Sequence, residues 1–373
     1  MTAEEEEWQP LLDHHLSQAG HRIMTRILVV DDSPFIRKAI TRIFLGRPEM
    51  QVVGTAQSGE EALERLPATR PQVVTLDVEM PGMGGLATLR EIQRRYPGLP
   101  VIMLSGYTKE GAETTLDAIS AGAVDFIDKS RLNVMDFDSL SRELVAKIGV
   151  WQQPPHAYSW DRAVPSTPGQ GVVPGAGVLS QIPWSSYDLC VIGASTGGPP
   201  ALQQIVSRVP EDFPLPIAVV QHMPVGFTRP FAERLDSLAR IRVKEAADHN
   251  TLQPGHMLLA RAGAHLFIEP DLTAHLSLDP MDGIHIPSVD VLMESASRAC
   301  PGRVVAILLT GMGDDGAEGM LAVHRSGGLT LAESEASCVV YGMPRAAHKR
   351  GAVSHMLSLP EICQLFAARS DDP

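Results

Sequence analysis

The strongest constraint on the fold is a regular alternation of short apolar runs with amphipathic stretches before residue 150. The apolar runs are ILVV (27–30), VVGTA (52–56), VVTL (73–76), VIML (101–104) and VDFI (124–127). Runs of this kind are typical of parallel strands that are buried on both faces of a sheet. The pattern predicts a doubly wound α/β domain whose functional residues lie at the carboxyl ends of the strands.

A second alternation begins near residue 187. Its apolar runs are LCVI (189–192), IAVV (217–220), MLLA (257–260), HLFIE (265–269), VVAILL (304–309) and LTLA (329–332). Between residues 255 and 280 short runs follow one another without a helical stretch, which is typical of antiparallel strands. We therefore expect a second α/β domain with a mostly parallel sheet and a small antiparallel insert.

The remaining segments lack this periodicity. Residues 1–24 are acidic and predict a solvated tail. Residues 150–185 are rich in proline and glycine and predict a linker. Three tryptophans, Trp151, Trp160 and Trp184, flank or interrupt this linker, and we expect them to pack against a domain. The chain then divides into a tail (1–24), a first domain (25–149), a linker (150–185) and a second domain (186–373).

Composition excludes several classes of function. The net charge of −13 and the lack of a basic stripe argue against binding to nucleic acid. No apolar run approaches the ~18 residues of a membrane span, so we expect no membrane insertion. The four cysteines are far apart and form no C-x-x-C pair, which favours reduced thiols over structural zinc. We expect a cytoplasmic monomer.

Polar residues stand at the carboxyl ends of the predicted strands of the first domain, where a parallel sheet places its functional residues. Asp31 and Asp32 follow the first run, Asp77 ends the third, Ser105 ends the fourth, and Lys129 follows the fifth. Three carboxylates at one sheet edge repel each other unless they hold a hard divalent cation such as Mg²⁺. The central Asp77 is then the expected phosphoryl acceptor, with a hydrogen bond from Ser105 and charge from Lys129.

The strings VVDDSPFIR, TLDVEMPGMGG, MLSG and GAVDFIDK resemble response-regulator receiver domains over about 125 residues. The resemblance implies a flavodoxin-like fold and phosphoryl transfer from a CheA-type histidine kinase to Asp77. It also implies that Asp32, Asp77 and the backbone carbonyl of Glu79 bind Mg²⁺. One departure is Ser130, which stands where the family usually has proline.

In the second domain, the segment VIGASTGGP (191–199) places Ser195 in a glycine-rich turn between a strand and a helix. This matches the G-x-S-x-G pattern of a nucleophile elbow, in which the helix start offers N–H groups to an oxyanion. Taken alone, the same string suits a phosphate-binding turn of a dinucleotide site equally well.

Two other strand ends favour hydrolysis. His222 follows the run IAVVQ and Asp315 follows VVAILLT, so a base and a carboxylate reach the same sheet edge as Ser195. A single histidine is more often structural than catalytic, but His222 stands directly at a predicted strand end. The chain order is serine, histidine, acid, whereas α/β-hydrolases run serine, acid, histidine.

The strings IGASTGGP, QHMPVGFTRPFAERLD, PSVDVLMESA, LLTGMGDDGAEGM and EASCVVYGMPRAA resemble the catalytic domain of the CheB family of chemotaxis methylesterases. The resemblance implies that Ser195 is the nucleophile, His222 the general base and Asp315 its orienting partner. It further implies that the backbone around Thr196 and Met312 polarises the substrate carbonyl. The hydrolase would need no cofactor.

The family pattern G-M-G-x-D-G assigns the acid to Asp315 and leaves the adjacent Asp314 at a variable position. Two departures, Arg261 and Ile286, stand where the family often has proline and arginine. The implied substrates are glutamate methyl esters on methyl-accepting chemoreceptors, and many members also deamidate receptor glutamines.

Three interpretations remain at this stage. The first is a phosphorylation-activated protein-glutamate methylesterase. The second is a binding module that docks on a receptor array, which has no need of a complete Ser/His/Asp set. The third keeps the chemistry but serves receptors of another pathway.

Overall fold

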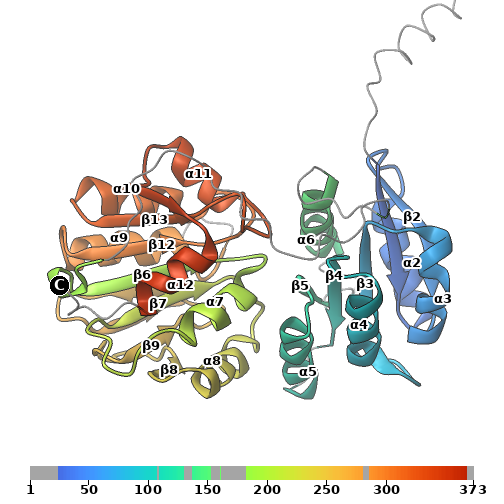
Figure 1. Ribbon diagram of the computed structural model, residues 1–373, viewed down its shortest axis with the longest axis horizontal. Coiled ribbons are helices and arrows are strands. Elements are labelled where there is room, and N and C mark those ends of the chain that lie inside the picture. The colour runs from blue at the N-terminus through green and yellow to red at the C-terminus, as the bar shows by residue number, and fades with distance from the viewer. Residues whose placement is uncertain are drawn as a thin grey trace, which may run out of the picture.

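The computed structural model describes residues 24–106, 109–129, 137–152, 160, 182–279 and 285–367. Two α/β units lie side by side, one before residue 153 and one after residue 181 (Figure 1). Residues 1–23 of the predicted tail and most of the predicted linker fall outside the described residues. Among the described helices, none is long and apolar enough to cross a membrane.

The N-terminal unit is a five-stranded sheet in the order β2-β1-β3-β4-β5. Every pairing is parallel, as the doubly wound prediction requires. Burial explains the apolar runs, because strands β3 and β4 are covered on both faces along their whole length. The strands are β1 (Thr25–Val30), β2 (Met50–Ala56), β3 (Val73–Asp77), β4 (Val101–Ser105) and β5 (Asp125–Asp128).

Helices cover both faces of this sheet. Helix α2 (Pro34–Phe44) contacts α6 (Phe137–Gly149), while α4 (Gly84–Arg95) contacts both α3 (Gly59–Thr69) and α5 (Lys109–Ser120). Ser33 caps α2 by accepting a hydrogen bond from the Ile36 N–H, and Pro34 fits the first helical position. Because the helix starts sharply after Ser33, Asp31 and Asp32 stay at the end of β1.

The C-terminal unit is a seven-stranded sheet in the order β14-β13-β12-β6-β7-β9-β8, and all of its pairings are parallel. A separate antiparallel pair joins β10 to β11. The strands are β6 (Leu189–Ala194), β7 (Ile217–Gln221), β8 (Arg242–Glu245), β9 (His256–Leu259), β10 (His265–Ile268), β11 (Ala274–Ser277), β12 (Val304–Leu308), β13 (Leu329–Glu333) and β14 (His355–Leu357).

The antiparallel insert is smaller than predicted. The sequence pattern places the run 257–260 in this insert, but β9 pairs in parallel with β7 and β8 within the main sheet. The difference arises from β8, because only one of its four side chains in RVKE is buried. An edge strand of this kind carries little apolar signal, and without it β9 had no visible parallel neighbours.

Helices again lie on both faces. Helices α7 (Gly198–Val206), α8 (Thr228–Leu238) and α12 (Leu359–Ala367) cover one face, and α9 (Val289–Ala299), α10 (Ala317–Arg325) and α11 (Met343–Lys349) cover the other (Figure 1). The central strands β6, β7 and β12 are therefore fully buried. Their carboxyl ends carry the three residues predicted to form a hydrolytic site.

The tryptophans around the linker pack against the two units, as predicted. Trp151 is buried, and the Trp160 indole N–H donates to the Pro71 carbonyl at 2.7 Å. The Trp184 ring stacks on that of Phe366, with centroids 5.2 Å apart. These contacts anchor both ends of the predicted linker on the two units. Each end forms a short 3-10 turn, Val150–Gln152 and Trp184–Ser186.

Candidate active site

The sheet order brings Ser195 and His222 together. Strand β6 lies between β7 and β12, so the residues that follow all three strands meet at one edge. The Ser195 N–H donates to the Thr310 carbonyl at 3.0 Å, and the His222 N–H donates to the Ala194 carbonyl at 3.1 Å. The backbones of the predicted nucleophile and base are thus held by neighbouring strand ends.

Glycines after Ser195 allow the chain to turn sharply into α7. Gly197 has a φ of 79°, which side-chain-bearing residues rarely adopt, and a Cβ there would lie 2.5 Å from the Cβ of Val339. The Gly198 N–H donates to the Ser195 carbonyl at 2.8 Å as the helix begins. Ser195 consequently sits at a helix N-terminus, where partial positive charge favours a developing oxyanion.

His222 and Asp315 form a direct hydrogen bond between His222 Nε2 and Asp315 Oδ2, 2.7 Å apart. The other ring nitrogen, His222 Nδ1, is buried and has no hydrogen-bond partner among the described residues. With Nε2 bonded to the carboxylate, Nδ1 is the ring nitrogen whose lone pair is left to accept a proton.

The start of helix α9 holds the Asp315 carboxylate. Ser288 Oγ donates to it at 2.7 Å, and the N–H groups of Val289 and Asp290 donate at 2.7 and 3.0 Å. Burial acts to raise the pKa of Asp315. The His222 hydrogen bond and charge and the two backbone donors outweigh burial and hold that pKa well below its usual range.

Asp314 has different surroundings. Its side chain is 73% exposed and pairs with Arg350 at 3.2 Å. The structure therefore places Asp315, and not its neighbour, against His222, as the family pattern implied.

The two residues predicted to supply oxyanion donors lie beside the nucleophile's turn. Thr196 is buried, and its carbonyl accepts a hydrogen bond from Thr310 Oγ1 at 2.9 Å. Met312 lies in a loop fixed by Gly342, whose N–H donates to the Gly311 carbonyl at 3.0 Å. In the described parts of the chain, the N–H groups of Thr196 and Met312 donate to no protein acceptor, so both remain available to a substrate oxygen.

Sequence reasoning missed three residues of this site. His285 stacks on His222 with ring centroids 4.2 Å apart and planes 13° apart, and burial followed by the His222 charge lowers its pKa. Gln221 is buried against the backbone of the site, and Ser288 holds Asp315. A signal existed only for Ser288, which precedes the apolar run of α9 as helix-capping serines do.

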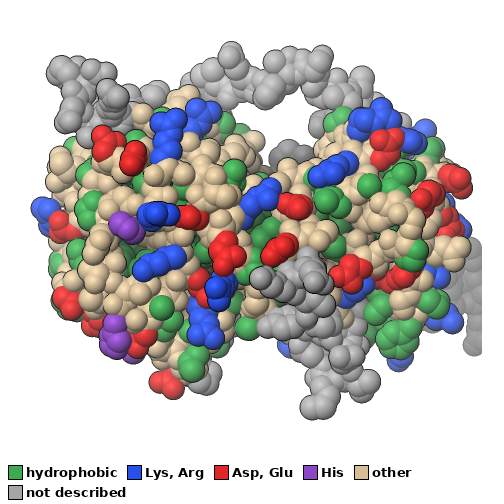
Figure 2. Space-filling view, turned by 90° about the horizontal axis from the view of Figure 1, so that it is seen from below, with side chains coloured by type: hydrophobic (Ala, Val, Ile, Leu, Met, Phe, Trp, Pro, Cys, Tyr) green, Lys and Arg blue, Asp and Glu red, His purple; other side chains and the backbone are tan. Residues whose placement is uncertain are grey.

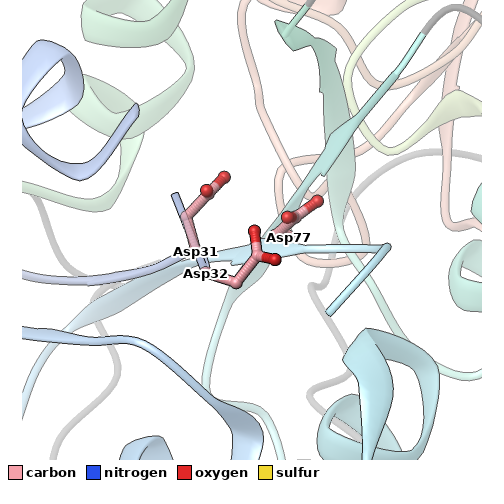
Figure 3. A group of neighbouring side chains, drawn as sticks. All are labelled: Asp31, Asp32 and Asp77. Carbon is pink, nitrogen blue, oxygen red and sulfur yellow. The ribbon is translucent and has the colours of Figure 1, made fainter. Parts of the chain in front are cut away.

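The carboxylates predicted in the N-terminal unit also converge. Oxygens of Asp31, Asp32 and Asp77 lie within 4.8 Å of one another at the ends of β1 and β3 (Figure 3). Lys129 Nζ lies 2.5 Å from Asp77 Oδ1 and 3.9 Å from Asp31 Oδ2. The Glu79 N–H donates to Asp77 Oδ1 at 3.2 Å.

This cluster fits a divalent cation. One oxygen each of Asp31 and Asp77 is buried without a hydrogen-bond partner in the described residues. Burial, reinforced by the Asp77 charge, raises the pKa of Asp31 to about 6. Burial also raises the pKa of Asp77, although Lys129 opposes the shift. A hard cation bound by these oxygens would compensate the buried charge.

Ser105 lies buried at the end of β4, and its hydroxyl is engaged by helix α5. Thr115 Oγ1 donates to Ser105 Oγ at 2.8 Å, and Ser105 Oγ donates to the Gly111 carbonyl at 3.3 Å. The Thr115 contact has no signal in the sequence, because a threonine in the middle of a helix has no distinctive pattern.

Comparisons with known proteins identify the family to which both units are related. Residues 190–366 match the family model "CheB methylesterase", and residues 27–135 match "Response regulator receiver domain". The chain is 40% identical, over 92% of its length and 99% of the relative's, to the protein-glutamate methylesterase/protein-glutamine glutaminase of Lawsonia intracellularis. It is 42% identical to that of Symbiobacterium thermophilum, over 90% of this chain and 94% of the relative.

Among solved structures, the catalytic domain of Thermotoga maritima CheB methylesterase is 38% identical, with a TM-score of 0.46. That match covers 49% of this chain and 98% of the solved one. On the family models and the full-length relatives, the chain belongs to the CheB methylesterase family and carries a response regulator receiver domain before its methylesterase domain.

Proposed function

We propose that this protein is a phosphorylation-activated protein-glutamate methylesterase that hydrolyses glutamate methyl esters on chemoreceptors and also deamidates receptor glutamines. The observation that carries the proposal is the His222–Asp315 hydrogen bond at the sheet edge where Ser195 opens helix α7. Family membership supports the same activity, since the relatives are named for both reactions.

The reaction follows from the roles that the geometry allows. Ser195 Oγ attacks the ester carbonyl while His222 Nδ1 accepts the hydroxyl proton, and the N–H groups of Thr196 and Met312 stabilise the oxyanion. The C–O bond then breaks, and methanol leaves with the proton from His222. Water attacks the glutamyl–Ser195 ester with the same base, which restores the serine and releases glutamate. A glutamine substrate would release ammonia in place of methanol.

Asp315 contributes by fixing the imidazole. Because its carboxylate accepts from Nε2, the neutral ring carries its proton on Nε2 and presents a lone pair on Nδ1. After the ring takes the serine proton, the same carboxylate stabilises the imidazolium. The donors at the start of α9 keep Asp315 ionised for this role.

The receiver's own residues suit phosphoryl transfer to Asp77 from a CheA-type histidine kinase. Asp31, Asp32, Asp77 and the Glu79 carbonyl would hold Mg²⁺, which supplies charge neutralisation for the incoming phosphoryl group. Lys129 and Ser105 would then engage the phosphoryl oxygens. Because its proposed partners are a kinase and chemoreceptors, we propose a cytoplasmic location. We also propose that the enzyme is a monomer. We also keep the division into 1–24, 25–149, 150–185 and 186–373 as a proposal.

The decisive experiment measures methanol release from a methylated receptor. Ser195→Ala should lose activity by at least about 10⁴-fold, since loss of a nucleophile removes the whole acyl-transfer route. Its thermal midpoint should match the wild type. Methanol release by Ser195→Ala at the wild-type rate would contradict the serine-hydrolase mechanism.

A further inference from the structure

The side-chain amide of Gln221 lies between the nucleophile and the base. Gln221 is the last residue of β7 and is 1% exposed. Its Nε2 donates to the carbonyl of Ser195 at 3.0 Å and to the carbonyl of His222 at 3.0 Å. One NH₂ group thus joins the main chains of both catalytic residues.

The orientation of this amide is determined by its partners. Both are carbonyl oxygens, which only accept hydrogen bonds, so the NH₂ group must face them. The other end, Gln221 Oε1, is buried and has no hydrogen-bond partner among the described residues. An unpaired buried acceptor lowers stability, so the contribution of this amide lies in its two hydrogen bonds to the main chain of the site.

The fold makes room for the amide. A Cβ at Gly198 would lie 2.0 Å from Gln221 Oε1, so the glycine that opens α7 leaves the space that the side chain fills. The ladder between β6 and β7 ends with the pair Ala194 and Gln221. Beyond that pair the chains diverge, with Ser195 entering the turn to α7 and His222 entering the loop to α8.

We propose that Gln221 is a positioning residue for the hydrolytic reaction, whose amide holds the Ser195 and His222 main chains at the distance that proton transfer requires. It touches neither substrate nor leaving group. This inference rests on the proposed hydrolysis at Ser195, and it adds a residue whose effect is confined to the chemical step.

The kinetic consequence is specific. Misplacing a nucleophile relative to its base by about 1 Å costs on the order of 10²-fold in rate. Gln221→Met keeps the side-chain length but has no donor. It should lower kcat on methylated receptor by about 10- to 100-fold and leave KM unchanged, because the receptor surface is intact.

Gln221→Glu provides a pH signature. At neutral pH the carboxylate of this variant only accepts hydrogen bonds, so it repels the carbonyl oxygens of Ser195 and His222. When it is protonated, its O–H group can donate a hydrogen bond to one of them. Its kcat relative to wild type at the same pH should therefore rise as the pH falls. Taking this ratio cancels the pH dependence that both proteins share through the ionisable side chains around the site, His222, His285, Asp315 and Glu333.

The control is Gln364→Glu, which makes the same change of charge on the exposed face of α12 and should retain wild-type kcat. Wild-type kcat in both Gln221 variants would overturn the proposal. So would a loss of kcat that is matched by a rise in KM and is the same at every pH, since that pattern indicates general disruption.

A crystal structure of Gln221→Met separates this proposal from the proposed function. The Ser195 and His222 carbonyls should move apart, and their unchanged positions would overturn the positioning role whatever the activity. Absence of methanol release from the wild type would instead contradict the methylesterase assignment, while the structural comparison would still test Gln221.

Discussion

Asp314 and Asp315 are neighbours in the chain with opposite surroundings. The Asp315 side chain is 9% exposed and bonded to His222, whereas that of Asp314 is 73% exposed and pairs with Arg350 on the surface. The four hydrogen bonds that the buried Asp315 carboxylate accepts support the orienting role proposed for it. An exposed ion pair contributes little to stability or chemistry.

Replacement of each aspartate by asparagine tests this difference. Asp315→Asn should lower kcat by about 10⁴-fold, because an amide no longer secures the imidazole tautomer with a free Nδ1. Asp314→Asn should stay close to wild type. Methanol release from methylated receptor is the measurement, and the reverse ranking would show that the acid has been misassigned.

The raised pKa of Asp31 predicts how Mg²⁺ binding depends on pH. Its folded-state pKa is raised to about 6 by burial and the Asp77 charge, so it is protonated below that pH and ionised above it. Without metal, ionising this buried group disfavours the fold as the pH rises through 6. Mg²⁺ needs the ionised form and offsets that cost.

Added Mg²⁺ should therefore raise the thermal midpoint more at pH 8 than at pH 5. Asp31→Asn removes the titrating group, so its Mg²⁺-induced rise should be smaller and should vary less with pH. Equal Mg²⁺-induced rises at both pH values in the wild type would contradict the assignment of Asp31 to the cation site.

At the scale of elements, helix α9 contributes its N-terminus to the site. Ser288 both caps the helix, by accepting from the Val291 N–H at 3.4 Å, and donates to Asp315. Two further donors to Asp315 are backbone N–H groups of the first turn. The helix thus anchors the acid of the site with groups that it would otherwise leave unpaired.

Ser288→Ala should lower the free energy of unfolding by about 1 kcal/mol through loss of the cap. Its kcat should fall far less than that of Asp315→Asn, because both backbone donors remain. Urea unfolding and methanol release check the two effects, with Ser288→Thr as the control that retains a hydroxyl. A kcat loss in Ser288→Ala as large as that of Asp315→Asn would contradict this division of roles.

At the scale of the whole molecule, the two units meet through α5, which contacts α7 and α8. Arg234 of α8 pairs with Asp117 at 2.8 Å and donates to Ser120 at 3.1 Å. The Phe126 and Phe227 rings pack with centroids 4.6 Å apart. Figure 2 shows acidic and basic side chains side by side where the units meet.

This interface lies close to His222, the proposed general base, and connects through α5 to Ser105 beside the proposed phosphoryl acceptor Asp77. Val225 and Phe227, in the loop that follows His222, line a cleft of about 710 Å³ together with Ala112 of α5. The same helix bonds Ser105 through Thr115. A phosphoryl group that draws Ser105 away would remove that bond from α5, which gives a physical route from Asp77 to the interface.

We therefore expect the unphosphorylated receiver to restrict access of a receptor helix to Ser195. In the full-length protein, Arg234→Ala should raise basal methanol release by about two- to five-fold, as loss of a partly exposed ion pair shifts a modest interface. Arg298→Ala, which removes an ion pair within α9, is the control. Unchanged basal activity of Arg234→Ala would favour independent domains.

Two further measurements belong to the same prediction. Residues 186–373 alone should release methanol faster than the unphosphorylated full-length protein, and Asp77→Asn should not respond to a small phosphodonor. Equal rates for the isolated hydrolase and the whole protein would show that the receiver does not restrict the active site and serves only to direct the enzyme to its receptors.

The amino-acid sequence alone determined the strands that carry the chemistry. Their runs are apolar along their whole length because both faces are buried, and this signal does not depend on distant contacts. Parallel strands end at one edge, so residues such as Ser195, His222 and Asp77 could be placed there from the sequence. Edge strand β8 carries no such signal, because only one of its four side chains is buried.

Only the tertiary structure decided which atoms meet. The donors from Ser288 to Asp315, from Gln221 to Ser195 and from Thr115 to Ser105 join segments 27, 26 and 10 residues apart. The stacking of His285 on His222 and the Arg234–Asp117 pair join still more distant ones. Such contacts depend on side-chain rotamers and on how packed helices cross the sheet, which leave no periodic trace in the chain.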